Sequence, residues 1–354
     1  MTDADSPTET ETETETETET EPDATVPNSS PAVPRDVEPL PVEEAAATAR
    51  SVVENVERVI VGHHDEVEDV VVALLARGHV LLEDVPGVGK TMLARAVARS
   101  VDSSFRRVQF TPDLLPSDVT GSNVFNQKTR EFEFRDGPVF ANIVLGDEIN
   151  RAPPKTQSAL LEAMEELQVT VDGTTRPVPR PFTVIATQNY VEPSRTYELP
   201  VAELDRFMKK VRLGYPDRDE ETEMLDRVVG THPIEDLEPV TGRDRLRRAI
   251  AAVSQVTTEE AVRDYAARLA GFTRTHATLG ASPRGTIALL RAAQARATLA
   301  GRDYVVPDDV QAEAAPVFGH RIRTTTDDVG EAPDAEAHEL VEQALDRVPV
   351  DRTQ

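Results

Sequence analysis

Short apolar runs alternate with longer amphipathic segments between residues 43 and 214. In the longer segments, apolar residues such as Val67, Val70 and Leu74 recur at helical spacing, which predicts helices. These helices are expected over 43–60, 63–77, 87–99 (where a loop leads into the helix) and 156–167. Strands are expected at the apolar runs 79–83, 108–110, 143–145 and 183–186. Strands that alternate with helices are typical of a parallel sheet with helices on both faces, so the predicted fold class is α/β.

The pattern changes at Gly214-Tyr215-Pro216, where a glycine and a proline predict a hinge. After this point only helical spacing is found. The helices are expected over 218–229, 243–253, 259–276, 284–299 and 307–319. The predicted organisation is an acidic tail over 1–42, an α/β core over 43–214 and an all-α domain over 215–354.

Two inserts in the α/β region, 121–140 and 169–181, are predicted to form hairpins. In the second, Asp172-Gly173 is a favourable tight turn. In the first, Phe132 and Phe134 alternate with glutamates, as expected of a strand. That strand either packs on the sheet or projects to grip a client protein, and the sequence leaves both interpretations open.

The chain is strongly acidic, with a net charge of -26 and no cysteine. Seven consecutive Thr-Glu pairs fill residues 8–21, a segment that cannot bury a core and is expected to be disordered. Five of the 38 basic residues are lysine, which resembles the surfaces of halophile proteins or reflects an arginine-rich coding bias. Excess negative charge disfavours binding to nucleic acid. Without an apolar stretch of about 18 residues or a signal peptide, we expect a cytoplasmic protein with no membrane span.

A phosphate-binding loop is predicted where Gly87-Val88-Gly89-Lys90-Thr91 follows a strand and opens a helix. Glycines let backbone amides approach a phosphate, and the helix N-terminus favours its negative charge. Lys90 is then placed to reach the β- and γ-phosphates, and the Thr91 hydroxyl to ligate Mg²⁺. The usual first glycine of such a loop is replaced here by Asp84.

An acidic pair, Asp147-Glu148, ends the apolar run 143–145. At the carboxyl edge of a parallel sheet this pair would lie beside the phosphate loop. Asp147 is the expected Mg²⁺ ligand, and Glu148 is expected to polarise the attacking water. The alternative is a solvated acidic turn, which the order of strand, loop and helix before the acidic strand makes a poorer explanation.

The longer motifs resemble the MoxR family of AAA+ ATPases over about residues 50–350. The resemblance is carried by the segments Gln109–Asp118, Asp147–Glu166, Ala186–Asn189, Leu204–Phe207 and Gly280–Arg284. It implies a P-loop AAA+ core followed by a helical lid, with ATP and Mg²⁺ as the bound species. The implied nucleotide-binding residues are Val61, Gly62, Pro86, Gly87, Val88, Gly89, Lys90, Thr91 and Met92.

The same resemblance implies three further roles. Asn189 matches sensor 1, which places the water, and Arg206 matches the arginine finger, which reaches the ATP of a neighbouring subunit. Arg284 matches sensor 2, which couples the lid to the γ-phosphate. Each residue also has a structural alternative, because arginines often form surface salt bridges and asparagines often cap turns.

The function expected from this resemblance is ATP hydrolysis in a homo-oligomeric ring, a hexamer by family likeness. The energy would drive chaperone-like remodelling or maturation of protein clients. Metal-cofactor insertion and a von Willebrand factor A domain partner are further expectations that the family implies. The alternatives are a nucleic-acid-associated AAA+ motor or regulator, and a nucleotide switch with little turnover. The acidic charge opposes the first alternative, and Glu148, Asn189 and Arg206 together oppose the second.

Overall fold

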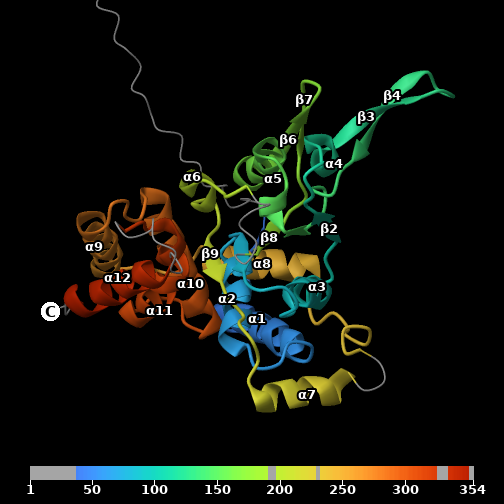
Figure 1. The fold of residues 1–354 in the computed structure, drawn as a ribbon. Coiled ribbons are helices and arrows are strands. Elements are labelled where there is room, and N and C mark those ends of the chain that lie inside the picture. The colour runs from blue at the N-terminus through green and yellow to red at the C-terminus, as the bar shows by residue number, and fades with distance from the viewer. Residues whose placement is uncertain (1–36, 190–196, 229–231, 325–333, 351–354) are drawn as a thin grey trace, which may run out of the picture. The chain divides into compact units, whose positions relative to one another are not determined.

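The computed structural model describes residues 37–189, 197–228, 232–324 and 334–350 (Figure 1). The Thr-Glu repeat, predicted to be disordered, lies outside these described residues. Among the described residues, no helix is long and apolar enough to cross a membrane.

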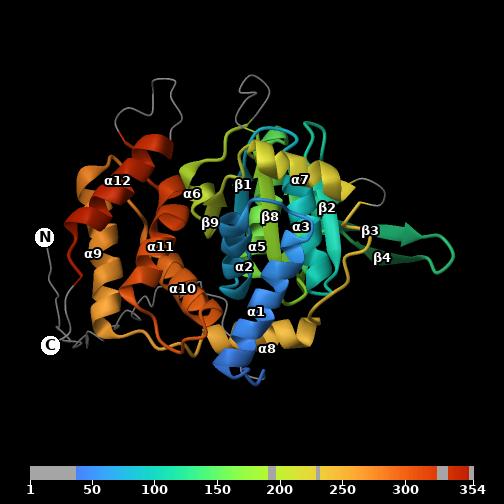
Figure 2. The same cartoon turned by 90° about the horizontal axis from the view of Figure 1, so that it is seen from below.

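A parallel sheet forms the centre of the first domain, as the alternating pattern predicts. Within the described part of the chain it has five strands in the order β2-β5-β8-β1-β9, and every neighbouring pair is parallel (Figure 2). The strands are β1 (Val80–Glu83), β2 (Phe105–Gln109), β5 (Ile143–Asp147), β8 (Thr183–Gln188) and β9 (Lys209–Val211). The sequence analysis did not anticipate β9, because two of its three residues, Lys209 and Lys210, are charged.

Helices precede and connect these strands. They are α1 (Val42–Glu57), α2 (His64–Leu75), α3 (Lys90–Ser100), α4 (Pro116–Thr120), η1 (Ile149–Arg151), α5 (Pro154–Glu166) and α6 (Val201–Leu204). Asp65 and Glu66 lie in the first turn of α2, where their negative charges interact favourably with the positive end of the helix dipole. Pro154 begins α5 at the position where the missing amide proton costs least.

Both faces of the sheet are buried, because successive strand residues point to opposite sides. Val80 and Leu82 of β1 belong to the apolar core that includes residues of α1, α2 and α3. Leu81 between them belongs to the other core, which includes Leu160 and Leu161 of α5. The sheet is therefore covered on both faces, and the predicted α/β fold class is confirmed.

Two hairpins extend from this domain at the predicted inserts (Figure 1). They consist of β3 (Gly121–Asn126) with β4 (Glu131–Asp136), and β6 (Gln168–Val171) with β7 (Thr174–Pro177). Asp172 and Gly173 both have positive φ angles, 49° and 76°, and form the predicted tight turn. In the first hairpin, Phe125 and Phe132 pack edge to face and remain 50% and 72% exposed. Phe125 and Phe132 therefore do not pack on the sheet, whereas Phe134 packs edge to face on Phe140, which contacts the apolar core.

The later part of the chain is helical. Its elements are α7 (Arg218–Val228), α8 (Arg243–Val253), α9 (Glu260–His276), α10 (Pro283–Leu299), α11 (Pro307–Phe318), η3 (Gly319–Arg321) and α12 (Asp334–Arg347). The helices α9 to α12 pack against one another, whereas α8 packs mainly against α1 and also touches α10. The predicted boundary at residue 214 stays a prediction.

A buried ionic cluster joins the sheet to α10 and α11. Lys209 of β9 is fully buried and forms ion pairs with Asp69 of α2, at 2.6 Å, and with Glu313 of α11. Arg296 of α10 pairs with the same two acids. Removing one member would leave buried charges uncompensated, which is strongly destabilising, so the cluster holds the two regions in a defined arrangement.

A second buried polar group, His79, lies immediately before β1. Its Nδ1 accepts a hydrogen bond from the Val184 amide at 3.0 Å, and its Nε2 donates to the Met164 carbonyl at 3.1 Å. Burial lowers the pKa of His79 to about 4, and the Met164 carbonyl offsets only part of this effect. The imidazole is therefore neutral and links the starts of neighbouring strands to the end of α5.

Candidate functional site

The predicted phosphate loop connects β1 to α3. Gly87 and Gly89 have φ angles of +94° and +98°, a conformation that L-residues with a side chain rarely adopt. An added Cβ at either glycine would meet no atom within 4 Å, so the space over the loop is open. Pro86 is exposed, whereas Val88 and Met92 pack against the core below. These residues thus form a cradle of backbone anchored by its apolar members.

Lys90 begins α3 and turns its ammonium group back toward the loop. Its Nζ donates to the carbonyls of Asp84 and Val85 at 2.7 and 3.0 Å, and to Asn189 Oδ1 at 2.9 Å. Burial lowers the pKa of Lys90, an effect that Asp84, Asp147 and nearby glutamates oppose. Hydrogen bonds to backbone carbonyls hold the ammonium at the mouth of the cradle.

Asp147 and Glu148 lie where β5 ends. Asp147 Oδ1 accepts from Thr187 Oγ1 at 2.7 Å, and Oδ2 accepts from Arg107 Nε at 3.0 Å. Thr187 Oγ1 also accepts from the Glu148 amide at 2.9 Å. Glu148 has a φ of 56°, in the left-handed region, which costs about 1–3 kcal/mol for a residue with a side chain. Strain of this kind is typical of functional sites.

Asn189, at the end of β8, completes the constellation. Its Nδ2 donates to Glu148 Oε1 at 2.9 Å, while its Oδ1 accepts from Lys90. Gln109 and Arg151 donate to the other carboxylate oxygen of Glu148, at 2.9 and 2.8 Å. The structure therefore brings together the lysine, the glutamate and the asparagine that the sequence indicated. Glu148 and Asn189 follow the strands β5 and β8, and Lys90 begins the helix after the loop that follows β1.

Asp84 occupies the position where a glycine is usual. Its side chain is almost fully buried and accepts from the amides of Val85, at 2.7 Å, and Gly214, at 2.6 Å. The aspartate thus ties the phosphate loop to the start of the predicted hinge. Asp84 is not among the residues with a positive φ, so the backbone at this position does not require glycine.

The implied adenine segment lies nearby in the chain. Val61 is buried, and Gly62 has a φ of +78°. A Cβ on Gly62 would lie 2.2 Å from Glu220 of α7, so this helix lies directly against the segment. The role of Val61 and Gly62 in binding a nucleotide base stays a prediction.

The two implied arginines, Arg206 and Arg284, meet at a single carboxylate. Arg206 Nε lies 2.9 Å from Glu165 Oε2 of α5, close enough for an ion pair but without hydrogen-bond geometry. Arg284 at the start of α10 pairs with Glu165 Oε1, and its other terminal nitrogen lies 3.9 Å from Asp205. Among the described residues, these contacts place Arg284 beside Arg206, and no contact joins either arginine to Lys90 or Glu148.

The residues present fit a nucleotide with Mg²⁺. The open space over Gly87 and Gly89 has room for phosphate oxygens. Thr91, whose hydroxyl is the expected Mg²⁺ ligand, is the residue after Lys90 in the first turn of α3. A carboxylate at a strand end, Asp147, is a hard oxygen ligand of the kind that Mg²⁺ prefers.

The sequence analysis assigned no role to the residues that orient this site, although Gln109 and Thr187 lie within segments that carry the family resemblance. Arg107, Gln109 and Thr187 bind the acidic pair, but none belongs to an acidic or glycine-rich motif. One signal was available: Arg107 and Gln109 alternate with the buried Val108 on β2, so both point to one face of an edge strand.

Comparisons with known proteins show the family of this chain. A family described as ATPase family associated with various cellular activities (AAA) matches residues 79–209, and an AAA lid domain matches residues 270–344. The chain is 44% identical over 284 residues to chaperone MoxR1 of Mycobacterium tuberculosis, covering 77% of this chain and 74% of that protein. The protein belongs to the MoxR family of AAA+ ATPases. The family resemblance expected from the sequence is thereby confirmed.

Other relatives extend over similar lengths. The chain is 52% identical over 303 residues to YeaC of Bacillus subtilis (strain 168), covering 85% of this chain and 95% of that protein. It is 33% identical over 291 residues to MoxR of Methylorubrum extorquens, covering 75% of this chain and 84% of that protein. A crystal structure from Cytophaga hutchinsonii matches with a TM-score of 0.81 and 36% identity, covering 88% of this chain and 97% of that one. The family assignment therefore spans both the core and the lid.

Proposed function

We propose that this MoxR-family protein hydrolyses Mg-ATP at a site shared between two subunits and uses the energy to remodel client proteins. The observation that carries the proposal is the chain of hydrogen bonds from Lys90 through Asn189 to Glu148. It joins a phosphate-binding cation to a candidate base through one polar side chain.

The residues of this chain then have separate tasks. Backbone amides of the loop and Lys90 bind the triphosphate, and Glu148 polarises the attacking water while Asn189 orients it. Thr91 and Asp147 would hold Mg²⁺, which neutralises phosphate charge when bound. Gln109 and Arg151 fix the Glu148 carboxylate from the side away from Asn189.

Arg206 has a task in a neighbouring subunit. Among the described residues its guanidinium contacts Glu165 and not its own phosphate loop, which supports a role in trans. A cation at the γ-phosphate stabilises the charge of the transition state and is worth about 10³–10⁵-fold in rate where it has been removed in other phosphoryl-transfer proteins. The ring, its hexameric size and a cytoplasmic location belong to this proposal.

The client is proposed to be a protein, as the chaperone name of the Mycobacterium relative suggests. The exposed pair Phe125 and Phe132 supports this, since an aromatic hairpin tip can hold an unfolded segment. More specifically, we propose metal-cofactor insertion as the client's maturation step and a von Willebrand factor A domain protein as a partner. The net charge of -26 argues against a nucleic-acid motor.

Two substitutions test the activity. Lys90→Ala should abolish ATP binding, whereas Glu148→Gln should bind ATP with an unchanged Kd and lose at least ~100-fold in kcat. Glu162→Gln, on the exposed side of α5, is the matched control and should behave as wild type. Normal turnover by the Glu148→Gln protein would remove Glu148 as the base.

A mixing experiment tests the shared site. Arg206→Ala subunits should bind ATP without hydrolysing it, and adding Lys90→Ala subunits should restore part of the turnover. Mixed interfaces regain one complete site, because the second variant supplies an intact Arg206. If no mixture regains activity, the site is not shared.

A further inference from the structure

Arg321 is a lid residue at the end of η3 and is buried to 2% exposure. Burying a guanidinium is costly unless its five N–H groups find acceptors. Burial lowers the pKa of Arg321, and the Asp205 carboxylate opposes that effect. The five donors of this buried guanidinium must therefore find acceptors nearby.

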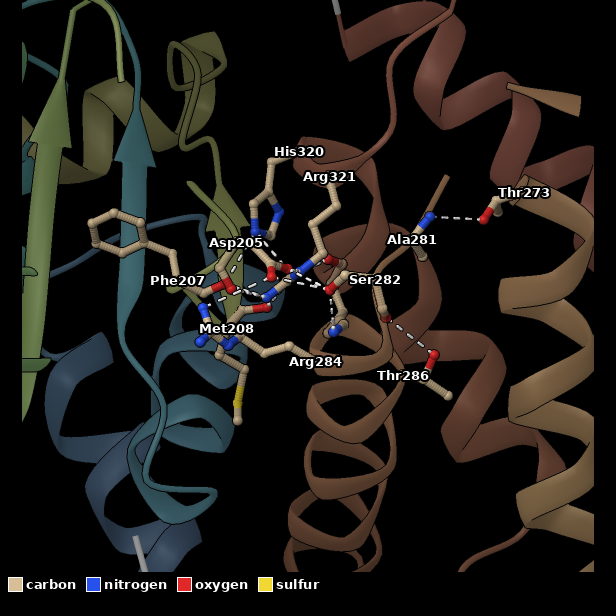
Figure 3. A network of polar contacts seen from close by, with 12 residues as sticks. Asp205, Phe207, Met208, Thr273, Ala281, Ser282, Arg284, Thr286, His320 and Arg321 are labelled. Atoms are coloured by element: carbon tan, nitrogen blue, oxygen red, sulfur yellow. Dashed lines mark hydrogen bonds and ion pairs between the residues drawn. The ribbon is translucent and has the colours of Figure 1, made fainter. Parts of the chain in front are cut away.

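The guanidinium of Arg321 is directed at one short backbone segment of the core (Figure 3). Nε donates to Asp205 Oδ1 at 2.7 Å. The terminal nitrogens donate to the backbone carbonyls of Asp205 at 3.0 Å, Phe207 at 2.6 Å and Met208 at 3.2 Å. A further bond to the Val317 carbonyl anchors Arg321 to its own lid helix, α11. Within the described structure, Arg321 thus binds residues on both sides of Arg206.

Two other lid residues hold the same segment. His320 Nε2 lies 3.1 Å from the Phe207 carbonyl and 2.9 Å from a terminal nitrogen of Arg321. Burial lowers the pKa of His320 well below its usual value, so the ring stays neutral. Ser282, which caps α10, donates to the Asp205 carboxylate from Oγ, 2.8 and 3.0 Å from its two oxygens (Figure 3). The backbone that carries Arg206 is therefore fixed to the lid and not to the sheet alone.

The arrangement differs for the Arg206 side chain itself. The Arg206 side chain is 28% exposed and forms an ion pair with Glu165. A firmly held backbone with a partly exposed side chain is what a residue needs if it must reach a second molecule at a set position. Errors of about 1 Å in the placement of such a group can cost about 100-fold in rate.

We infer that Arg321 is a positioning residue, through which the lid of one subunit sets the placement of Arg206 in the ATP site of its neighbour. The inference rests on the proposed shared site. Any lid movement that shifts η3 must carry residues 205–208 with it or break four hydrogen bonds from Arg321. Through these contacts the lid acts on the ATP site of the adjacent subunit.

The test uses the full chain with Arg321→Met, which keeps the volume and removes all five donors. We expect the Kd for a fluorescent ATP analogue to stay within about twofold and kcat to fall about 10–100-fold. Arg321→Lys keeps the charge but not the fork, and should retain part of the turnover. Thermal unfolding is measured for each variant, and Arg321→Lys and Asp205→Asn carry the test if Arg321→Met does not fold.

The decisive measurement is rescue by mixing. Arg321→Met subunits keep an intact phosphate loop, so Lys90→Ala subunits, which keep a well-placed Arg206, should restore their turnover. A purely structural defect within the Arg321→Met subunit would not respond to the neighbour. The same mixture with Arg206→Ala is run in parallel as the reference.

The outcomes separate the two ideas. If the Arg206→Ala reference is not rescued, the shared site itself is wrong. If the reference is rescued while Arg321→Met loses turnover without rescue, or keeps the wild-type kcat, the positioning role is overturned. Arg302→Met is the matched control, because Arg302 is a lid arginine that holds Asp309 and, in the described structure, makes no bond to residues 205–208. Its kcat should be unchanged, and an equal loss there would also overturn the inference.

Discussion

Asn189 and Glu148 are joined by a hydrogen bond of 2.9 Å from the amide nitrogen to a carboxylate oxygen. The amide oxygen of Asn189 is engaged at the same time by the Lys90 ammonium, also at 2.9 Å. One planar group therefore fixes the distance between a phosphate-binding cation and a candidate base. An aspartate at this position could not make both contacts, since an ionised carboxylate has no donor for Glu148.

Replacing Asn189 should separate binding from turnover. In Asn189→Ala the ATP Kd should change less than about threefold, while kcat falls about 100-fold because the water and Glu148 lose their orienting group. Steady-state phosphate release and equilibrium binding measure the two quantities. Asn126→Ala in the first hairpin serves as control, and wild-type turnover in Asn189→Ala would contradict the role.

Asp84 should matter for stability. Asp84→Ala leaves the amides of Val85 and Gly214 without their acceptor, which should lower the free energy of unfolding by about 1–3 kcal/mol. Urea unfolding with an unchanged m-value would measure it. Asp303→Ala, at an exposed position, should stay within about 0.5 kcal/mol of wild type. Equal stability of both variants would show that the contact with Gly214 contributes nothing.

Stability should fall in mild acid because of His79. Its pKa drops from 6.5 to about 4 on folding, so below pH 6.5 the unfolded chain binds a proton that the folded chain excludes. The contribution is complete above pH 6.5 and is lost as pH falls toward 4, by up to about 3 kcal/mol. Buried His320 acts in the same direction.

Two measurements check this dependence. The His79 imidazole protons should show no titration above pH 5 in NMR spectra. His79→Gln, which keeps a donor and an acceptor but cannot be protonated, should have a flatter unfolding free energy between pH 6.5 and 5. A His79 resonance that titrates near pH 6.5 in the folded protein would contradict the buried neutral state.

Salt should stabilise the fold. The chain has 64 acidic and 38 basic residues, and screening of like charges grows as the Debye length falls from about 10 Å at 0.1 M to about 3 Å at 1 M. We expect the Tm to rise over this range of KCl concentration. A variant without residues 1–36 should keep most of the rise, because 11 of the acidic residues lie in that segment and 53 lie elsewhere. A Tm that is independent of salt would rule out self-repulsion as a significant term.

The fold was predictable where apolar periodicity is strong. The runs at 79–83, 143–145 and 183–186 are buried on both sides, so their pattern is continuous and easily read. The edge strand β9 was not predicted, because the charge of Lys209 is balanced by Asp69 and Glu313, which are distant in sequence. A buried charge cannot be told from an exposed one without knowing its partners.

The residues of the candidate site likewise fall into a predictable group and a group that could not be predicted. Glycines, Lys90 and the acidic pair form local motifs whose chemistry is visible in the residues themselves. The contacts of Arg206, Arg284 and Arg321 depend on elements that fold together from separate parts of the chain, so their partners could not be derived from spacing. Of these, Arg321 carried no signal in the sequence at all.

Glu165 balances the charge of two guanidinium groups, one from the core and one from α10. If Arg206 turns away toward another anion, the full charge of this carboxylate remains for Arg284, and that ion pair becomes stronger. If Arg284 departs first, Arg206 is held more tightly. A shared counter-ion therefore makes the two arginines respond to each other by simple electrostatics, with no change of backbone required.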